Sequence, residues 1–423
     1  MEYQSRVVDP LLKDLLSGLP AIAIEGAKGV GKTATAQQYA SSTLNLDRAG
    51  VRSNVEADPE VILGMAPPTL IDEWQLVPPV WDVVRREVDR ERIPGRFILT
   101  GSSAPASGAR LHSGAGRIVR LRMRPMTLPE RGVCTPSVSF SRILAGEAQP
   151  VAGHCEFSLR DYTREILWSG LPGVRQDPPG YRLRQIDSYL TNSVEHDIPE
   201  LGVEVRRPAA LRAWLTAYAA ATSTTTNYTK ILNAATPGDS DKLSRVTAGV
   251  YRELLERMMI LEPLPAWTPV FNPLSRLAQV PKHHLVDPAL AARLLGATED
   301  SLLTDQIDGG ISREGTLLGA LFESLVVMTV RVFAEQIGGR VSHLRTRNGD
   351  HEVDLIVERD DHRVVAIEVK LSNSVSAADT KHLSWLTEST DDLVVDRLII
   401  NTGQFAHRLP DGTAVVPLAL LGP

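Results

Sequence analysis

The sequence has 423 residues, which is longer than a single hydrophobic core normally supports, so two or three domains are expected. Its apolar fraction of 43% and charged fraction of 23% are those of a folded globular protein and exclude a fibrous or disordered chain. The formal net charge of -6 excludes a chain that binds polyanions with its whole surface. Any nucleic-acid site therefore has to be local.

The cysteines and the apolar segments bear on the cellular compartment. Cys134 and Cys155 are the only two cysteines, too few for a disulfide framework or a zinc site, which fits a reducing cytosol. The apolar run 317–332 contains Glu323 and Arg331 and is shorter than the roughly 20 residues of a membrane span, so it predicts a buried helix. The first ten residues lack the features of an export signal. We expect a cytoplasmic protein without a membrane segment.

Residues 1–130 alternate helical patterns with short apolar runs, which predicts a parallel β-sheet with helices between its strands. The apolar run 21–25 leads into a Gly-x-x-x-x-Gly-Lys-Thr loop and then into a predicted helix at 33–41, the context in which this motif binds phosphate. Backbone N–H groups and the positive helix end would hold the phosphates, the lysine would bridge the β- and γ-phosphates, and the threonine hydroxyl would bind Mg²⁺. The predicted ATP-binding residues are Gly26, Ala27, Lys28, Gly29, Val30, Gly31, Lys32 and Thr33.

Two acids and a hydroxyl residue follow the next predicted strands. Asp72 ends the strand 69–72 and is expected to hold magnesium through water, while the adjacent Glu73 is expected to polarise the attacking water. The strand 97–100 leads to Ser102, our candidate for a sensor of the γ-phosphate beside Asp72. A simple Thr-Gly-Ser turn is the alternative there.

Six arginines and one acid lie between residues 110 and 131. Such a strip can neutralise phosphate charge or contact nucleic acid, and a solvated face is the alternative. Arg117, directly after Gly116, is our candidate for action on a nucleotide, because a guanidinium fits phosphate geometry.

The middle of the chain is predicted to be helical. Residues 132–153 are rich in Pro, Ser, Gly and Ala without periodicity, which predicts a linker or flexible loop that closes the first domain. Three helices and a short strand then follow in the order of a winged helix, at 209–221, 229–235, 244–259 and 260–264. This module can contact DNA through basic residues on or near its last helix, or it can serve as a joint between proteins. Those basic residues are Arg245, Arg252 and Arg257.

The last third of the sequence predicts a second α/β unit, with a helix and three strands at 317–337, 353–357, 364–369 and 397–401. Asp354 lies in one strand, and Glu368 and Lys370 share a face of the next. Two converging carboxylates can hold a magnesium ion against a phosphodiester, and a lysine can orient or deprotonate water, which is the pattern of metal-dependent nuclease chemistry. Glu323, on the preceding helix, is the candidate third acid. Solvated charges on an edge strand are the alternative.

Further motifs follow the phosphate loop along the chain: DEWQ at 72–75, LTGSS at 99–103, GR at 116–117, PMTL at 125–128, EHDI at 195–198, PKHHLVD at 281–287, GDHEVD at 349–354 and IEVK at 367–370. Together they resemble a prokaryotic AAA-type P-loop ATPase family with a C-terminal domain of unknown function. The resemblance spans nearly the whole chain. Residues 47–68, which are irregular, and 135–153, which look like an insertion, depart from it.

The resemblance implies an α/β protein of three parts. These are an AAA-like P-loop ATPase domain at 1–155, a central helical winged-helix segment at 156–270 and a restriction-endonuclease-like α/β domain at 271–423. ATP and Mg²⁺ are the expected cofactors.

Two functions are compatible with this sequence. In the first, the protein binds and hydrolyses ATP and couples the AAA-like module to the winged helix and to a metal-dependent nuclease domain that acts on DNA. In the alternative, ATP switches a regulatory protein, and the C-terminal domain is a docking module that cuts nothing. DNA, a second copy of the chain and another protein are all left open as partners.

Overall fold

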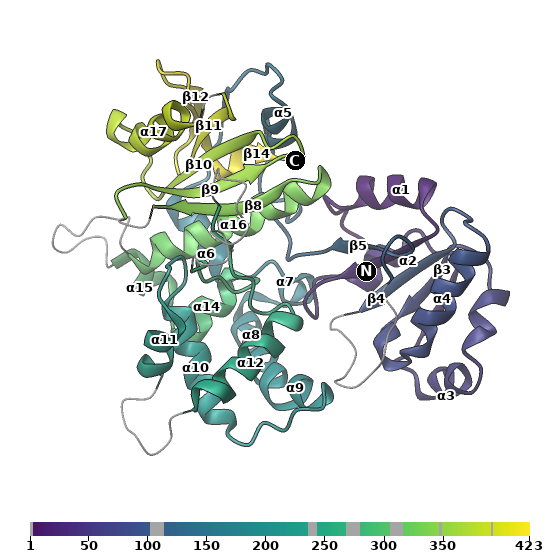
Figure 1. Ribbon diagram of the computed structural model, residues 1–423. Coiled ribbons are helices and arrows are strands. Elements are labelled where there is room, and N and C mark those ends of the chain that lie inside the picture. Colours follow the sequence, from purple (N-terminus) through teal and green to yellow (C-terminus); the bar gives the residue numbers. More distant parts are fainter. Residues whose placement is uncertain are drawn as a thin grey trace.

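A computed structural model describes residues 3–101, 114–235, 243–267, 280–304, 316–346, 349–390 and 392–423. Figure 1 shows three regions: an N-terminal α/β unit on one side, a group of helices, and a C-terminal sheet above those helices. The candidate Ser102 lies outside the described residues.

The N-terminal unit contains a five-stranded sheet in the order β2-β3-β4-β1-β5, with every pairing parallel. Its strands are β1 (Ala21–Glu25), β2 (Ser42–Asn45), β3 (Thr69–Asp72), β4 (Phe97–Gly101) and β5 (Val119–Arg122). Its helices are α1 (Asp9–Gly18), α2 (Lys32–Gln37), α3 (Ala49–Ala57) and α4 (Pro79–Arg90). The predicted parallel sheet is confirmed. Strand β2 was not predicted, because only one of its four residues is a large apolar one.

The central region is helical, as predicted. It comprises α6 (Leu159–Leu167), α7 (Pro172–Gln176), α8 (Pro179–Asn192), a π-helical turn (Ser193–Asp197), α9 (Ile198–Glu200), α10 (Pro208–Ala220), α11 (Tyr228–Ala234), α12 (Arg245–Arg257), α14 (Pro288–Leu294) and α15 (Glu299–Thr304). The three helices expected for a winged helix are therefore present as α10, α11 and α12. The segment after α12 forms isolated bridges, Leu261 to Leu285 and Leu264 to Lys282. The winged helix itself stays a prediction.

The C-terminal region is a seven-stranded mixed sheet in the order β7-β12-β13-β11-β10-β9-β8. The long helix α16 (Leu317–Gln336) leads into β8 (Arg340–Arg345), β9 (Glu352–Glu358) and β10 (Val364–Lys370), which pair antiparallel. Parallel pairing then joins β10 to β11 and β11 to β13. The remaining elements are α17 (Lys381–Ser389), β11 (Val394–Asn401), β12 (Phe405–Arg408), β13 (Ala414–Pro417) and β14 (Leu421–Gly422).

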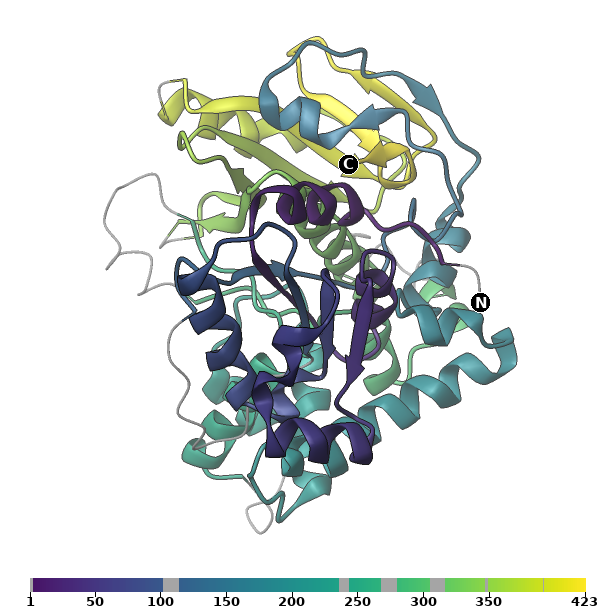
Figure 2. The same cartoon turned by 90° about the vertical axis from the view of Figure 1, so that its right-hand side faces the viewer.

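The interpretation of 132–153 as a linker is wrong for residues 138–145 and 153, which lie in a helix and two strands. Strand β6 (Val138–Ser139) pairs with β14, and β7 (Gly153–His154) pairs with β12, so both belong to the C-terminal region. Between them, α5 (Phe140–Ala145) buries Phe140, and the ring of Phe140 lies 6.3 Å from that of Phe333 on α16. Figure 2 shows this blue segment beside the yellow strands. Only the folded chain reveals these partners, since all of them lie far away along the chain.

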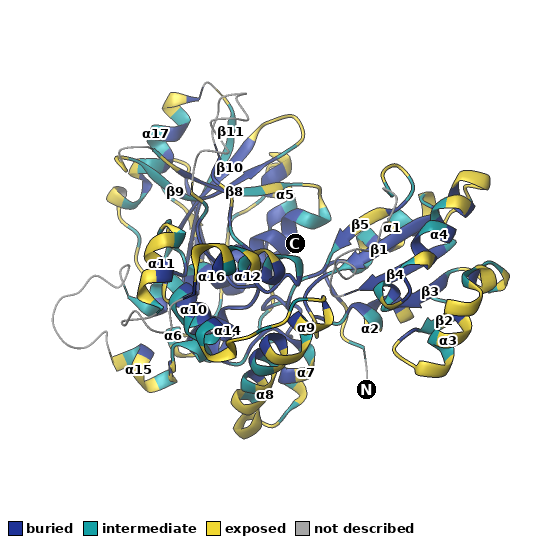
Figure 3. Cartoon of the chain, turned by 60° about the horizontal axis from the view of Figure 1, so that its bottom comes forward, coloured by how far each residue is buried: buried dark blue, intermediate teal, exposed yellow. Residues whose placement is uncertain are grey.

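The largest hydrophobic core runs through all three regions. It contains Ile24 of β1, Leu211 of α10 and Ile367 of β10, together with most of α16. Among the described residues, α16 is the one helix long and apolar enough to cross a membrane, and 72% of its most apolar window is buried inside the protein. Figure 3 shows that exposed residues gather on peripheral helices such as α3 and α8, whereas the sheet strands are largely buried. Helix α16 is therefore a core helix, as predicted.

Candidate nucleotide site

The phosphate loop joins β1 to α2, and its glycines are required by the backbone. Gly29 and Gly31 have φ values of 81° and 101°, a left-handed conformation that side chains with a Cβ rarely adopt. A Cβ on Gly26 would lie 2.2 Å from the carbonyl oxygen of Met123. The loop therefore curls tightly at the start of α2, which is the geometry that directs backbone N–H groups at a phosphate.

Lys32 is the first residue of α2 and is 5% exposed. Its Nζ donates to the carbonyl oxygens of Gly26 and Ala27, at 2.9 and 3.0 Å. Burial lowers the pKa of Lys32 to about 8, although the carboxylates of Glu73 and Asp72 act in the opposite direction. The ammonium is therefore held inside its own loop, where a bound phosphate would replace the two carbonyl groups as its partner.

Thr33, Asp72 and Thr100 meet at the carboxyl ends of β3 and β4. The Oγ1 of Thr33 donates to Asp72 Oδ1 at 2.7 Å, and Thr100 Oγ1 donates to the same oxygen. Asp72 and Thr100 are direct partners in the β3–β4 register. A hydroxyl and a carboxylate this close fit the oxygen ligands that Mg²⁺ prefers. Sequence reasoning missed Thr100, although the pairing of neighbouring apolar strands could have placed it beside Asp72.

Glu73 follows β3 in a left-handed conformation, with φ of 55°. This turn lets the side chain of Gln75 donate a hydrogen bond to the Glu73 carboxylate. Burial raises the pKa of Glu73 above its usual value, while the bond from Gln75 and the charge of Lys32 lower it. Non-glycine residues seldom adopt positive φ, and active sites are among the places where they occur.

Arg117 does not reach the phosphate loop of its own chain. Its Nε lies 2.7 Å from Asp89 Oδ1 on α4, and 40% of its side chain is exposed. A different residue approaches the loop from outside the N-terminal unit: Asp197, in the π-helical turn after α8. Its Oδ1 accepts a hydrogen bond from Lys28 Nζ at 2.9 Å. The sequence contained Asp197 within the EHDI motif but gave no indication of this contact.

Arg6 supports the loop from the N-terminal segment and is 6% exposed. It donates to the carbonyl oxygens of Val30 and Arg124, both at 2.7 Å, and to Glu130 Oε1 at 2.9 Å. Sequence reasoning missed this role, because an arginine near a chain terminus carries no motif. Arg6 ties the phosphate loop to the segment that follows β5.

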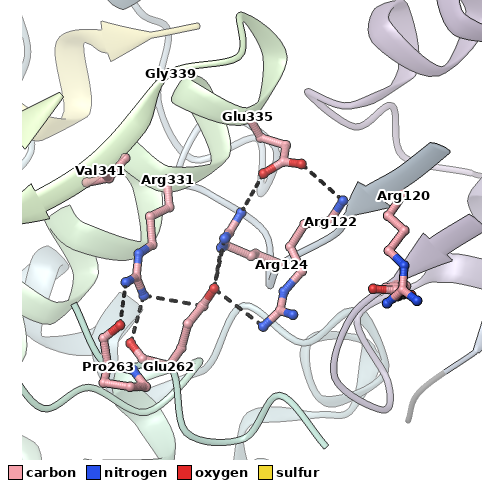
Figure 4. Close-up of a pocket in the computed structure, with 10 residues that line it drawn as sticks. Arg120, Arg122, Arg124, Glu262, Pro263, Arg331, Glu335, Gly339 and Val341 are labelled. Atoms are coloured by element: carbon pink, nitrogen blue, oxygen red, sulfur yellow. Dashed lines mark hydrogen bonds and ion pairs between the residues drawn. The ribbon is translucent and has the colours of Figure 1, made fainter. Parts of the chain in front are cut away.

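That segment leads to a junction of the three regions, which is lined by charged side chains around a cavity of about 480 Å³. Figure 4 shows the side chains of Arg124 and Arg331 directed toward Glu262, and Arg124 also reaches Glu335 on α16. Arg124 Nε donates to Glu262 Oε1 at 2.9 Å. Although burial acts in the opposite direction, the guanidinium groups of Arg124 and Arg331 lower the pKa of Glu262 to about 2. The junction is held by charges that are largely removed from water.

The residues predicted for the C-terminal site lie on β9, β10 and α16, but a lysine lies among them. Lys282 Nζ lies 2.9 Å from Asp354 Oδ1 and 3.0 Å from Glu323 Oε1. Burial raises the pKa of Glu323 to about 8 and, together with the charge of Asp354, raises that of Glu368 well above its usual range. The predicted set is thus brought together in part, around an ammonium that sequence reasoning overlooked.

Lys370 lies at the edge of this cluster, with its Nζ 3.9 Å from Glu368 Oε2 and 3.8 Å from Asp379 Oδ1. Within the described ranges, no group of three or more His, Cys, Asp or Glu side chains is arranged to hold a metal ion. The metal and catalytic roles of the C-terminal residues stay predictions.

Comparisons with known proteins agree with a P-loop nucleotide-binding domain at the N-terminus. Residues 19–131 match the family described as AAA domain, residues 159–301 match a domain of unknown function (DUF8612), and residues 318–421 match another (DUF4143). The AAA and DUF4143 matches support a prokaryotic AAA-type ATPase family, and the AAA match indicates nucleotide binding.

Two curated proteins resemble the chain over most of its length. They are uncharacterized proteins of Mycobacterium bovis and Mycobacterium tuberculosis, each 26% identical over 414 residues. The similarity covers 96% of this chain and 82% of each relative. The names of these relatives give no activity.

Proposed function

We propose that the protein is a cytoplasmic, magnesium-dependent ATPase whose nucleotide state controls the helical and C-terminal regions. One observation carries the proposal: Lys32 and the pair Thr33–Asp72 converge at the carboxyl ends of β1 and β3. Thr33 and Asp72 would hold the magnesium ion, which neutralises phosphate charge when bound. Lys32 would bind the β- and γ-phosphates, and Glu73 would orient the attacking water.

The direct test is ATP turnover by the full chain with magnesium. Lys32→Ala is expected to abolish both binding and turnover, whereas Glu73→Gln should bind ATP and hydrolyse it slowly. The control is Lys13→Arg, which keeps the positive charge at an exposed position of α1. This variant should behave like wild type. Equal turnover by wild type and Lys32→Ala would refute the proposal. The same assay with GTP measures nucleotide preference.

Two contacts support coupling between the ATPase unit and the rest of the chain. Lys28 of the phosphate loop pairs with Asp197 of the helical region at 2.9 Å. Since 59% of the Lys28 side chain is exposed, a bound triphosphate can compete with Asp197 for its ammonium. In the segment that follows β5, Arg124 pairs with Glu262 and Glu335. A conformational change at the phosphate loop can therefore alter direct contacts with both the helical and the C-terminal regions.

Of the two functions compatible with the sequence, the C-terminal cluster favours the nucleotide-switched regulatory protein. The ammonium of Lys282 already pairs with Glu323 and Asp354, two of the three predicted metal ligands. The C-terminal domain is then a docking module for a protein partner or a second copy, and size-exclusion chromatography with an ATP analogue or ADP should give different assemblies. Mg²⁺- or Mn²⁺-dependent cutting of DNA by wild type, lost in Lys370→Ala, would instead establish the nuclease function.

A further inference from the structure

Lys282 is a charged residue that is almost completely removed from water, because it is 1% exposed. Its backbone is fixed by two hydrogen bonds with Leu264, at 3.0 and 2.8 Å. Its Nζ lies 3.0 Å from Glu323 Oε1, 3.0 Å from Glu352 Oε1 and 2.9 Å from Asp354 Oδ1. Two of the three N–H donors of the ammonium form hydrogen bonds with Glu323 and Asp354, and Glu352 lies within ion-pair distance.

We propose that the Lys282 ammonium is the resident cation of this carboxylate cluster and replaces the divalent metal ion that the nuclease-like arrangement implies. The inference rests on the proposed non-cleaving role of the C-terminal domain and is independent of ATP hydrolysis. It assigns Lys282 a function that its sequence context, beside two histidines, does not suggest.

The distances support an ammonium in place of a metal ion. Oxygens about 2.9 to 3.0 Å from Nζ are at hydrogen-bond separation, whereas magnesium needs oxygens at about 2.0 to 2.1 Å in near-octahedral geometry. Both oxygens of Asp354 already accept a hydrogen bond, Oδ1 from Lys282 Nζ and Oδ2 from the backbone N–H of Val369, each at 2.9 Å. A metal at this point would have to displace Lys282, and the described residues contain no other group suited to hold one.

The burial of Lys282 explains why the ammonium stays in place. A buried charge is tolerated only when it is paired, and the removal of one partner of a buried pair is strongly destabilising. Glu323 comes from α16, Glu352 and Asp354 come from β9, and Lys282 comes from the segment bridged to Leu264. The ammonium therefore joins three separate parts of the chain, which is the structural role that a metal ion would otherwise have.

Binding of Mn²⁺ to the nucleotide-free full chain, followed by electron paramagnetic resonance, tests the proposal. Wild type and Asp354→Asn are expected to give the same Mn²⁺ titration. Lys282→Met, which keeps an unbranched side chain one atom shorter and removes the charge, should gain one Mn²⁺ per chain. The double variant Lys282→Met/Asp354→Asn should lose that gain. Lys381→Met, an exposed lysine at the start of α17, is the matched control and should gain none.

Two results would overturn the proposal: Mn²⁺ binding by wild type that disappears in Asp354→Asn or Glu323→Gln, or a folded Lys282→Met that binds no additional Mn²⁺. If Lys282→Met unfolds, recovery of its thermal transition with Mn²⁺ supports the proposal, and the comparison of wild type with Asp354→Asn still decides it. DNA cutting by wild type would refute the non-cleaving role itself. A wild type that binds Mn²⁺ through Asp354 and cuts nothing would refute the present inference alone.

Discussion

The pH dependence of ATP binding follows from the state of Lys32. Burial lowers the pKa of this residue to about 8 in the nucleotide-free protein. A bound triphosphate supplies negative charge at Nζ and therefore restores the ordinary pKa, above 10. ATP binding must then be accompanied by proton uptake wherever the free lysine is deprotonated.

The magnitude follows from the fraction of protein that carries the charged lysine. This fraction is about nine-tenths at pH 7 and about one-tenth at pH 9 for a pKa of about 8. The ATP dissociation constant should therefore rise about tenfold from pH 7 to pH 9, which is about 1.4 kcal/mol. The dissociation constant must rise with pH, because the charged form of Lys32 binds ATP and a higher pH removes that charge.

Isothermal titration calorimetry in buffers of different ionisation enthalpy measures both quantities. We expect proton uptake to rise from near zero at pH 7 to nearly one proton per ATP at pH 9. Lys32→Arg keeps its charge at every pH tested and should show neither effect, whereas Lys13→Arg should match wild type. A dissociation constant that stays constant from pH 7 to pH 9 in wild type, without proton uptake, would refute the reasoning.

Three further outcomes are expected. Glu73→Gln should lower the ATP turnover rate by about 100-fold or more while ATP binding is retained, as measured by phosphate release and by fluorescent-nucleotide titration, because the carboxylate is needed only to orient water. Asp197→Asn should tighten ATP binding about twofold, since a partly exposed pair with Lys28 is worth about 0.5 kcal/mol, and unchanged or weaker binding would contradict the competition. Glu262→Gln should lower the free energy of unfolding by about 3 kcal/mol in urea, because it removes the carboxylate that pairs with the buried guanidinium groups of Arg124 and Arg331. The pKa of Glu262 in the folded protein is lowered to about 2. The stabilisation from ionised Glu262 is therefore complete above the ordinary glutamate pKa and is lost as the pH falls from there through 2. A wild-type free energy of unfolding that is constant across that pH interval would contradict this role of Glu262.

Local patterns in the sequence were sufficient to predict the residues of the nucleotide site. The phosphate loop needs its glycines, its lysine and its threonine within eight consecutive positions, and the apolar strand before it is a continuous buried run. Asp72 ends a strand of the same kind. In a parallel sheet the carboxyl ends of such strands lie at one edge, so the sequence alone could predict that Asp72 faces Thr33.

Tertiary structure decided the features that depend on residues far apart in the chain. Arg117, chosen for its place beside a glycine, pairs with Asp89, whereas Asp197 reaches the phosphate loop from the helical region. The segment 138–154 has the composition of a linker and yet supplies strands to the C-terminal region. Lys282 lies within the PKHHLVD motif, but that motif does not indicate its three carboxylate neighbours, Glu323, Glu352 and Asp354. The sequence does not show which charged side chains are buried or which charges pair with them. Both depend on contacts between distant residues, which no local pattern contains.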